Sequence, residues 1–297
     1  MRTIHKPISI SEQNATTCFE LCSPIRIYLG DFIMISYKRI CLVVVVLIFW
    51  AFSILEAEGG FMYSHIIEHV DFNKVFIGRQ VDVFFSQSDL TSIIVKTIES
   101  DRIDYIAIDF KDGELSISQK PYMVSQIFGW KKTEGKSFNT NIQVYITSPN
   151  IEQIDFAGNG KMCFETEITS DAMTLKVSNG GEINTKNLNI EQLIMNAEKG
   201  RFIVGDIVSI STIISLEGTS NLTTGHINAD YLELNLSMTS EGKAVFGEIH
   251  SRNIKTNINT IAEIQFANVT AEEIELKMPR KRPFPFESIN NMRLILD

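Results

Sequence analysis

Polar and apolar residues alternate along most of the chain, which is the pattern of β-strands with one buried face. The alternation is clearest in five stretches rich in Val, Ile and Phe, at residues 73–89, 91–98, 104–110, 114–119 and 141–149. Asp112-Gly113 predicts a tight turn between two of them. Residues 121–140, with Pro121, Gly129 and Gly135, predict a long loop or an insertion. No segment shows a 3.6-residue apolar stripe, so little helix is expected.

From residue 150 onward the alternation becomes a repeat of about twenty residues. Apolar residues, most of them between two polar ones, recur at intervals of 20, 19, 20, 22 and 20 positions: Ile168, Leu188, Ile207, Ile227, Ile249 and Val269. A second inward column is predicted at Ile154, Leu175, Leu193, Ile214, Leu232, Ile254 and Ile274, and a column of corner glycines at Gly158, Gly180, Gly200, Gly218 and Gly242. A period near twenty with short strands is typical of a β-solenoid.

The physics of such a stack explains the repeat. Each turn of a parallel β-solenoid lies about 4.8 Å from the previous one, so equivalent inward residues form an aliphatic ladder. Leu188 is therefore expected to face the core, with Asn187 and Asn189 facing solvent. The fold class predicted is all-β, a right-handed parallel β-helix with rungs of about 20 residues. We expect a single domain over residues 61–297, with clear repeats over residues 150–278.

The N-terminal region predicts export. Lys38 and Arg39 precede an apolar run over residues 40–55, and acidic residues follow it. This arrangement places the body outside the cytoplasm. The run is short for a bilayer span, so residues 34–57 are interpreted as a signal peptide, with a retained membrane anchor as the alternative. Residues 1–33 form a mixed leader before Met34 and are interpreted as a start-site artefact.

Charge and cysteine content narrow the possible partners. The chain has a net charge of −9, which repels phosphate backbones, so no nucleic-acid partner is expected. A membrane is expected to be contacted only through residues 40–55. Three of the four cysteines lie at positions 18, 22 and 41, which leaves Cys163 alone in the body. One thiol cannot form an intramolecular disulfide, so this is not a cysteine-stapled scaffold.

Several stretches resemble one bacterial family. These are DFNKVFIGRQVDVFFSQSD, DGELSIS, IQVYITSPNIEQIDFAGNG and SNGGEINTKNLN, which together represent a region of roughly residues 70–278. They look like the head GIN domain family of autotransporter adhesins. The resemblance implies an extracytoplasmic right-handed β-helix, and it implies no established catalytic residues.

Two kinds of catalytic chemistry, zinc-dependent proteolysis and polysaccharide cleavage, each require a particular residue pattern. HIIEH, with His65, Glu68 and His69, matches a zinc-peptidase pattern that needs both histidines on one helical face. It leads into β-rich sequence, so an ordinary polar entry segment is expected instead. Polysaccharide cleavage requires clustered carboxylates, and no acidic cluster is repeated across the rungs.

One column of outward residues could place metal ligands together. Asp206, His226 and Glu248 are predicted to occupy equivalent positions on three successive rungs, where a metal ion is one hypothesis and a solvated polar ladder the other. The sequence predicts no catalytic residue, no cofactor and no committed metal site.

The function predicted from these observations is an exported cell-envelope or surface binding module of adhesin type. It is located in the periplasm, at the cell surface or in the medium, and its ligand is an unknown glycan or protein. The alternative is a β-helical carbohydrate-active enzyme, and a retained anchor would leave room for a signalling role.

Overall fold

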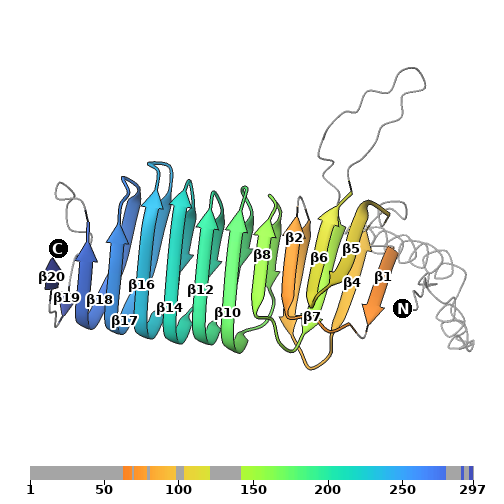
Figure 1. The fold of residues 1–297 in the computed structure, drawn as a ribbon, viewed down its shortest axis with the longest axis horizontal. Coiled ribbons are helices and arrows are strands. Elements are labelled where there is room, and N and C mark those ends of the chain that lie inside the picture. The colour runs from red at the N-terminus through yellow and green to blue at the C-terminus, as the bar shows by residue number, and fades with distance from the viewer. Residues whose placement is uncertain are drawn as a thin grey trace, which may run out of the picture.

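The computed structural model describes residues 63–68, 70–78, 81–97, 104–120, 142–278, 289–290 and 294–296. This part of the chain is almost entirely β-strand, with no α-helix, and forms a parallel β-solenoid of about six turns. Figure 1 shows its strands side by side along one long axis, with the strands nearest the N-terminus at one end and β20 at the other. The predicted fold class is confirmed.

Twenty strands build the part of the stack that the structure describes. In chain order they are β1 (Tyr63–Glu68), β2 (Lys74–Gly78), β3 (Asp82–Gln87), β4 (Ser92–Thr97), β5 (Ile106–Lys111), β6 (Glu114–Gln119), β7 (Ile142–Ser148), β8 (Gln153–Ala157), β9 (Lys161–Phe164), β10 (Ile168–Ser178), β11 (Glu182–Asn184), β12 (Leu188–Glu198), β13 (Arg201–Val204), β14 (Ile207–Gly218), β15 (Asn221–Thr224), β16 (Ile227–Met238), β17 (Lys243–Ile258), β18 (Glu263–Lys277), β19 (Ile289–Asn290) and β20 (Leu294–Leu296).

The strands form three faces around one core. The aromatic sheet, named for Phe84 and Tyr145, contains β1, β4, β7, β3, β9, β11, β13, β15 and the first parts of β17 and β18. The histidine sheet, named for His226 and His250, contains the first parts of β10, β12, β14 and β16, the middle of β17 and β18, and β19. The groove sheet contains β5, β6, β2, β8, the last parts of β10, β12, β14, β16, β17 and β18, and β20.

The first predicted ladder is present residue for residue. Ile168, Leu188, Ile207, Ile227, Ile249 and Val269 are each paired with the next along the stack, and all are buried. Asn187 and Asn189 are exposed on either side of Leu188. The alternation of this stretch therefore has the expected cause, one inward side chain between two outward ones.

The second predicted column is wrong because it mixes two ladders. One true ladder contains Ile154, Leu175, Met195, Ile214, Leu234, Thr256 and Leu276, and the other contains Met173, Leu193, Thr212, Leu232, Ile254 and Ile274. The two ladders are inward positions of the same strands, two residues apart. Their spacing along the chain is 19 to 22 residues in both cases.

The predicted glycine column is also wrong in its alignment. The position that precedes β9, β11, β13, β15 and β17 is held by Gly160, Gly181, Gly200, Ser220 and Gly242. Gly218 aligns instead with Asn179 and Lys199, a column in which all three residues have a positive φ of 55° or more. The glycines that were predicted to form one column therefore lie at two different positions in the turns, only one of which is the positive-φ column of Gly218.

A second corner holds glycines that the sequence analysis did not single out. Gly205, Gly225 and Gly247 stack on successive rungs, each two residues before its member of the first ladder. A Cβ on Gly247 would lie 2.4 Å from the carbonyl oxygen of Gly225, and one on Gly225 would lie 2.3 Å from Oδ1 of Asp206. No side chain fits at this corner on these rungs.

The N-terminal strands are not stacked in chain order. β2 lies between β6 and β8, and β3 lies between β7 and β9, all in parallel. β4 then pairs antiparallel with β7, β1 pairs antiparallel with β4, and β5 pairs antiparallel with β6. The stretch predicted as one run at residues 73–89 is two strands on different faces. The Asp112-Gly113 turn is confirmed, with φ values of 52° and 76°, whereas the expected loop at residues 121–140 lies outside the described residues.

One side chain closes the open end of the histidine sheet, which begins only at β10. The Gln87 amide donates to the carbonyl oxygens of Pro149 (2.9 Å) and Thr169 (2.8 Å), and its Oε1 accepts from the Thr169 N–H at 2.9 Å. A primary amide has the same donor and acceptor pair as a peptide group. Gln87 thus takes the place of a missing strand.

Candidate functional site

The HIIEH motif lies on a strand. His65 and Glu68 are in β1, which pairs antiparallel with β4, whereas His69 lies outside the described residues. Residues three apart on a strand point to opposite faces. The helical face that a zinc peptidase needs is therefore absent from β1, and the polar entry segment stays a prediction.

The outward column of the histidine sheet brings Asp206, His226 and Glu248 together as predicted. The His226 ring places Nδ1 at 3.0 Å from Oδ1 of Asp206 and Nε2 at 3.6 Å from Oε2 of Glu248. The same Glu248 oxygen lies 3.9 Å from Nε2 of His250, a residue that the sequence analysis did not include. All four side chains are about half exposed or more.

This column is a polar ladder rather than a converging set of metal ligands. The imidazole of His226 lies between the two carboxylates and presents a different nitrogen to each. A single ion cannot be reached by both nitrogens of one ring. Within the part of the chain that the structure describes, no group of three or more His, Cys, Asp or Glu side chains is arranged to hold a metal.

Asp206 also has a structural role at the corner. Its Oδ1 accepts from the backbone N–H of His226 at 2.8 Å, just as Oδ1 of Asn187 accepts from the N–H of Asp206 at 3.1 Å one rung earlier. The hydrogen bonds from the backbone and the ring of His226 lower the pKa of Asp206. Because the neutral Asn187 accepts the equivalent hydrogen bond one rung earlier, the negative charge of Asp206 is not needed for this bond.

We therefore expect Asp206→Asn to change the free energy of unfolding by less than about 1 kcal/mol at pH 7, since exposed ion pairs contribute little. The lowered pKa of Asp206 means that its contribution is present above the unfolded pKa and is lost as the pH falls through the folded pKa. The difference between wild type and variant should therefore shrink as the pH falls from 7 through the folded pKa of Asp206, which lies below its ordinary value. Urea unfolding at pH 7 and pH 3 measures it, and a loss at pH 7 of several kcal/mol would contradict this assignment.

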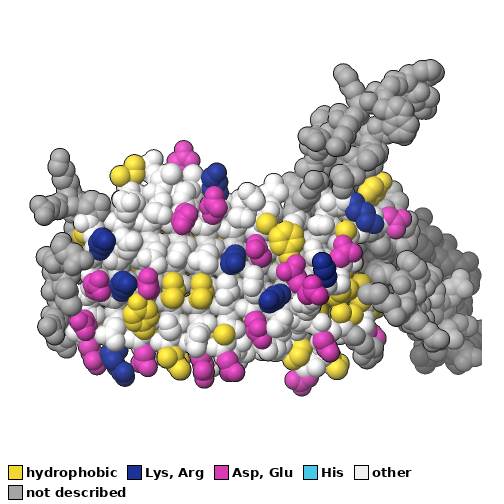
Figure 2. Space-filling model, in the orientation of Figure 1, with side chains coloured by type: hydrophobic (Ala, Val, Ile, Leu, Met, Phe, Trp, Pro, Cys, Tyr) yellow, Lys and Arg dark blue, Asp and Glu magenta, His cyan; other side chains and the backbone are white. Residues whose placement is uncertain are grey.

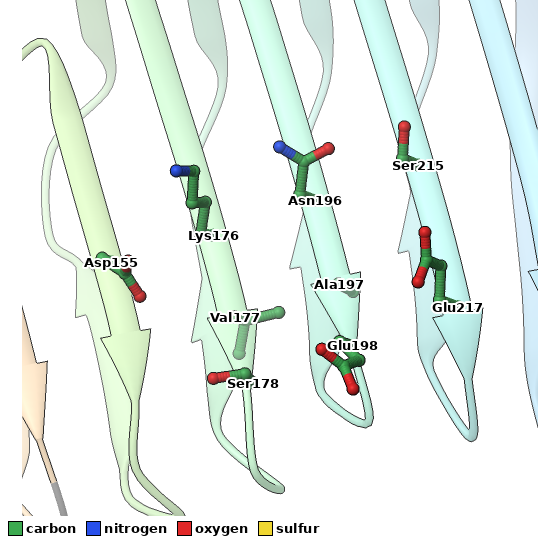
Figure 3. A pocket seen from close by; sticks show the side chains of 9 residues that line it. All are labelled: Asp155, Lys176, Val177, Ser178, Asn196, Ala197, Glu198, Ser215 and Glu217. Carbon is green, nitrogen blue, oxygen red and sulfur yellow. The ribbon is translucent and has the colours of Figure 1, made fainter.

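A shallow groove runs across four strands of the groove sheet. Its floor is one outward row of paired residues, Asp155 on β8, Lys176 on β10, Asn196 on β12 and Ser215 on β14. A second outward row, two residues further along the strands, supplies Ser178, Glu198 and Glu217. Figure 3 shows these polar side chains projecting from adjacent strands toward the viewer. The groove encloses about 300 Å³ and is open to solvent.

The floor of the groove has unused hydrogen-bonding capacity. Within the described part of the chain, Asp155, Lys176, Asn196 and Ser215 make no side-chain hydrogen bond or ion pair. Two rungs beyond Asn196 in the same row, the Asn235 amide instead donates to Glu233 at 3.1 Å. Figure 2 shows acidic and basic side chains interspersed over this face. The groove therefore offers one cation, two acids on its rim, a third acid on its floor and neutral polar groups.

Neighbouring groups on β16 fix one end of this face. Tyr231 donates to Glu233 at 2.8 Å, and burial together with this bond raises the pKa of Tyr231 to about 12. The hydrogen bonds from Asn235 and then Tyr231 lower the pKa of Glu233. Glu233 is thus an occupied, ionised acceptor, and the free groups lie on β8 to β14.

The groove was not predicted from the sequence. The residues on its floor come from four rungs and share only their outward position. No short sequence motif identifies residues that are related in this way. A signal was available in the repeat, because Asn196, Asn235 and Asn257 are spaced by multiples of about twenty residues. The structure also finds no helix long and apolar enough to span a membrane among the residues that it describes, and the segment at residues 40–55 lies outside them.

Comparison with known proteins places the chain in a family. The family described as "Putative auto-transporter adhesin, head GIN domain" matches residues 71–237. Among solved structures, a putative adhesin from Bacteroides fragilis is similar with a TM-score of 0.54 and 16% identity, covering 78% of this chain and 93% of its own. A putative adhesin from Parabacteroides distasonis has a TM-score of 0.36 and 17% identity, with 79% and 93% covered. No curated protein matches the sequence. Because the family match spans more than half of the chain, this protein belongs to the head GIN domain family.

Proposed function

We propose that the protein is an extracytoplasmic, adhesin-like surface module that binds a glycan chain along the groove sheet and does not catalyse a reaction. The observation that carries the proposal is the open groove with unpaired Asp155, Lys176, Asn196 and Ser215 on its floor. Family membership and the export signal predicted at residues 34–57 support a location outside the cytoplasm.

The chemistry of the groove suits a hydroxyl-rich ligand. A sugar hydroxyl both donates and accepts, so it needs donors and acceptors side by side. Lys176 and the Asn196 amide donate, whereas Asp155, Glu198 and the Asn196 carbonyl accept. Equivalent positions repeat about every 4.8 Å along the stack, so an extended chain can lie across several rungs. Weak contacts on each rung would then add, and many copies on a surface would raise the overall avidity.

Glycan cleavage is the alternative, and the groove gives it little support. Glu198 and Glu217 are paired on adjacent strands, which is the sort of acid pair that glycosidases use. Both side chains are exposed at the rim of an open groove. A glycosidase needs one acid held protonated by a desolvated site, and an open rim supplies no such enclosure.

A glycan array probed with the purified protein tests the proposal. We expect binding to at least one class of glycan, reduced about ten-fold or more by Asn196→Ala and by Lys176→Ala, because each removes a donor from the floor of the groove. Asn228→Ala, the same amide-to-methyl change at an exposed position of the histidine sheet, is the control and should bind as wild type does. No binding to any glycan, or equal losses in all three variants, would contradict the proposal.

A further inference from the structure

The outer face of the aromatic sheet carries an apolar row that no described part of the chain covers. One outward residue per strand, in register from β1 to β18, forms this row: Ile66, Ile94, Tyr145, Phe84, Cys163, Asn184, Ile203, Thr223, Val245 and Gln265. Its first five members are all apolar or aromatic. The equivalent row of the histidine sheet is mostly polar, with Thr169, Asn189, Val208, Asn228, His250 and Thr270.

The two aromatic rings form a ridge along this row. Phe84 and Tyr145 stack with their ring centroids 4.9 Å apart and their planes at 17°. Lys96 places Nζ 4.1 Å from the centre of the Tyr145 ring. Rings stacked between neighbouring strands turn their faces toward each other and their edges outward. The ridge thus offers no ring face for a sugar to stack on, but it can pack against another flat apolar surface.

We propose that this row is the interface between two copies of the chain, related by a two-fold axis that runs parallel to the stack above the row. This axis lays each member of the row against the same member of the other copy. Phe84 meets Phe84, Tyr145 meets Tyr145, and Cys163 meets Cys163. Two such sheets pack face to face about 10 Å apart.

Under this axis, the rows on either side of the ridge bring opposite charges together at two positions and like charges together at none. One flanking row is Ser64, Lys96, Gln143, Asp82, Lys161, Glu182, Arg201, Asn221, Lys243 and Glu263, and the other is Glu68, Ser92, Thr147, Ser86, Glu165, Lys186, Gly205, Gly225, Gly247 and Ala267. The axis lays one row against the other. Lys161 then faces Glu165 of the other copy, and Glu182 faces Lys186 of the other copy. No two like charges oppose each other at any position.

A two-fold axis parallel to the strands does not share these properties. It would lay each flanking row against itself and would move most apolar residues away from their counterparts. Complementary charges select partners, whereas like charges placed opposite each other oppose association. The axis along the stack is therefore the one that the surface supports.

The size of the face is sufficient for a stable dimer. Ten strands spaced about 4.8 Å apart give a length of about 48 Å, and five residues of strand give a width of about 16 Å. The projected face is then on the order of 770 Å² per copy. A standard protein interface buries about 800 Å² on each partner.

Cross-linking through Cys163 tests the interface. The full chain is expressed in bacteria with Cys18, Cys22 and Cys41 replaced by serine, so that Cys163 is the sole thiol, and intact cells are treated with a short bismaleimide. Burial raises the pKa of the Cys163 thiol, so labelling is run at mildly alkaline pH. We expect a covalent species of twice the chain mass. A chain with Cys163→Ser and Asn196→Cys, whose sole thiol lies on the groove sheet, should give none.

A second pair of variants and a second readout complete the test. Phe84→Lys should lower the cross-linked fraction at least five-fold, whereas Asn228→Lys on the histidine sheet should leave it unchanged, with folding of both verified by limited proteolysis. Light scattering of the purified full chain, which does not depend on thiol reactivity, should give two copies per particle. One copy per particle, or equal cross-linking from Cys163 and from position 196, would overturn the proposal. The groove lies on another face, so this outcome is independent of glycan binding.

Discussion

Ile207→Asp is expected to destabilise the middle of the solenoid more than any other single change considered. Ile207 is fully buried in the first ladder, between Leu188 and Ile227. The substitution removes an aliphatic side chain at a cost of about 2–5 kcal/mol. It also places an unpaired carboxylate among apolar neighbours, which costs several kcal/mol more. The sum is on the order of the whole stability of a typical domain, about 5–15 kcal/mol.

The neighbouring residue provides the control. Val208 belongs to the same strand, faces outward and is 49% exposed. Val208→Asp introduces the same carboxylate into solvent, and its effect should stay within about 1 kcal/mol. Urea unfolding of both variants measures the difference. Equal midpoints for the two variants would show that the inward and outward assignment of β14 is reversed.

Gly247→Ala is expected to be the second most damaging change, although it adds only one methyl group. The new Cβ would lie 2.4 Å from the carbonyl oxygen and 2.7 Å from the carbonyl carbon of Gly225. These are backbone atoms of the adjacent rung, so the clash can be relieved only by separating two turns of the stack. Overpacking of this kind costs about 1–3 kcal/mol, and we expect the upper end of that range.

The equivalent residue on the next rung is the control for this change. Ala267 aligns with Gly247 in the pairing of β17 with β18 and already carries a Cβ. Ala267→Gly should cost no more than about 1 kcal/mol, from added chain flexibility alone. Thermal unfolding of the two variants tests the comparison. A Gly247→Ala protein as stable as wild type would mean that this corner is not tightly stacked.

The first ladder could be predicted because its residues stand alone between outward neighbours at a nearly constant spacing. Leu188 between Asn187 and Asn189 has one possible inward residue. The second column failed because its strands bury two residues that lie two positions apart, such as Met173 and Leu175. Both series repeat every 19 to 22 residues, so spacing alone cannot separate them. Only the hydrogen-bonded register distinguishes such neighbouring ladders.

The N-terminal strands were beyond prediction for a different reason. Their residues alternate correctly, and β4, β6 and β7 occupy nearly the predicted stretches. Their order in the stack is not their order in the chain. β2 lies between β6 and β8, and β3 lies between β7 and β9. Alternation reports which face of a strand is buried and does not report which strand it pairs with.

The candidate site shows the same limit. The column with Asp206, His226 and Glu248 was found because one period separates its members, but the sequence could not show that the His226 ring lies between the carboxylates. The floor of the groove combines Asp155, Lys176 and Asn196, which differ in residue type from rung to rung. A site that is made of different residue types at equivalent positions of adjacent strands can be recognised only when the register of those strands is known.

Calorimetric titration with an oligosaccharide identified on the array, followed by mass spectrometry of the recovered sugar, tests the proposed function most directly. The account predicts saturable binding to the wild-type protein, at least ten-fold weaker binding to Asn196→Ala, and an oligosaccharide recovered with its mass unchanged. A shortened or otherwise altered oligosaccharide, or equal affinity of the wild type and Asn196→Ala, would contradict it.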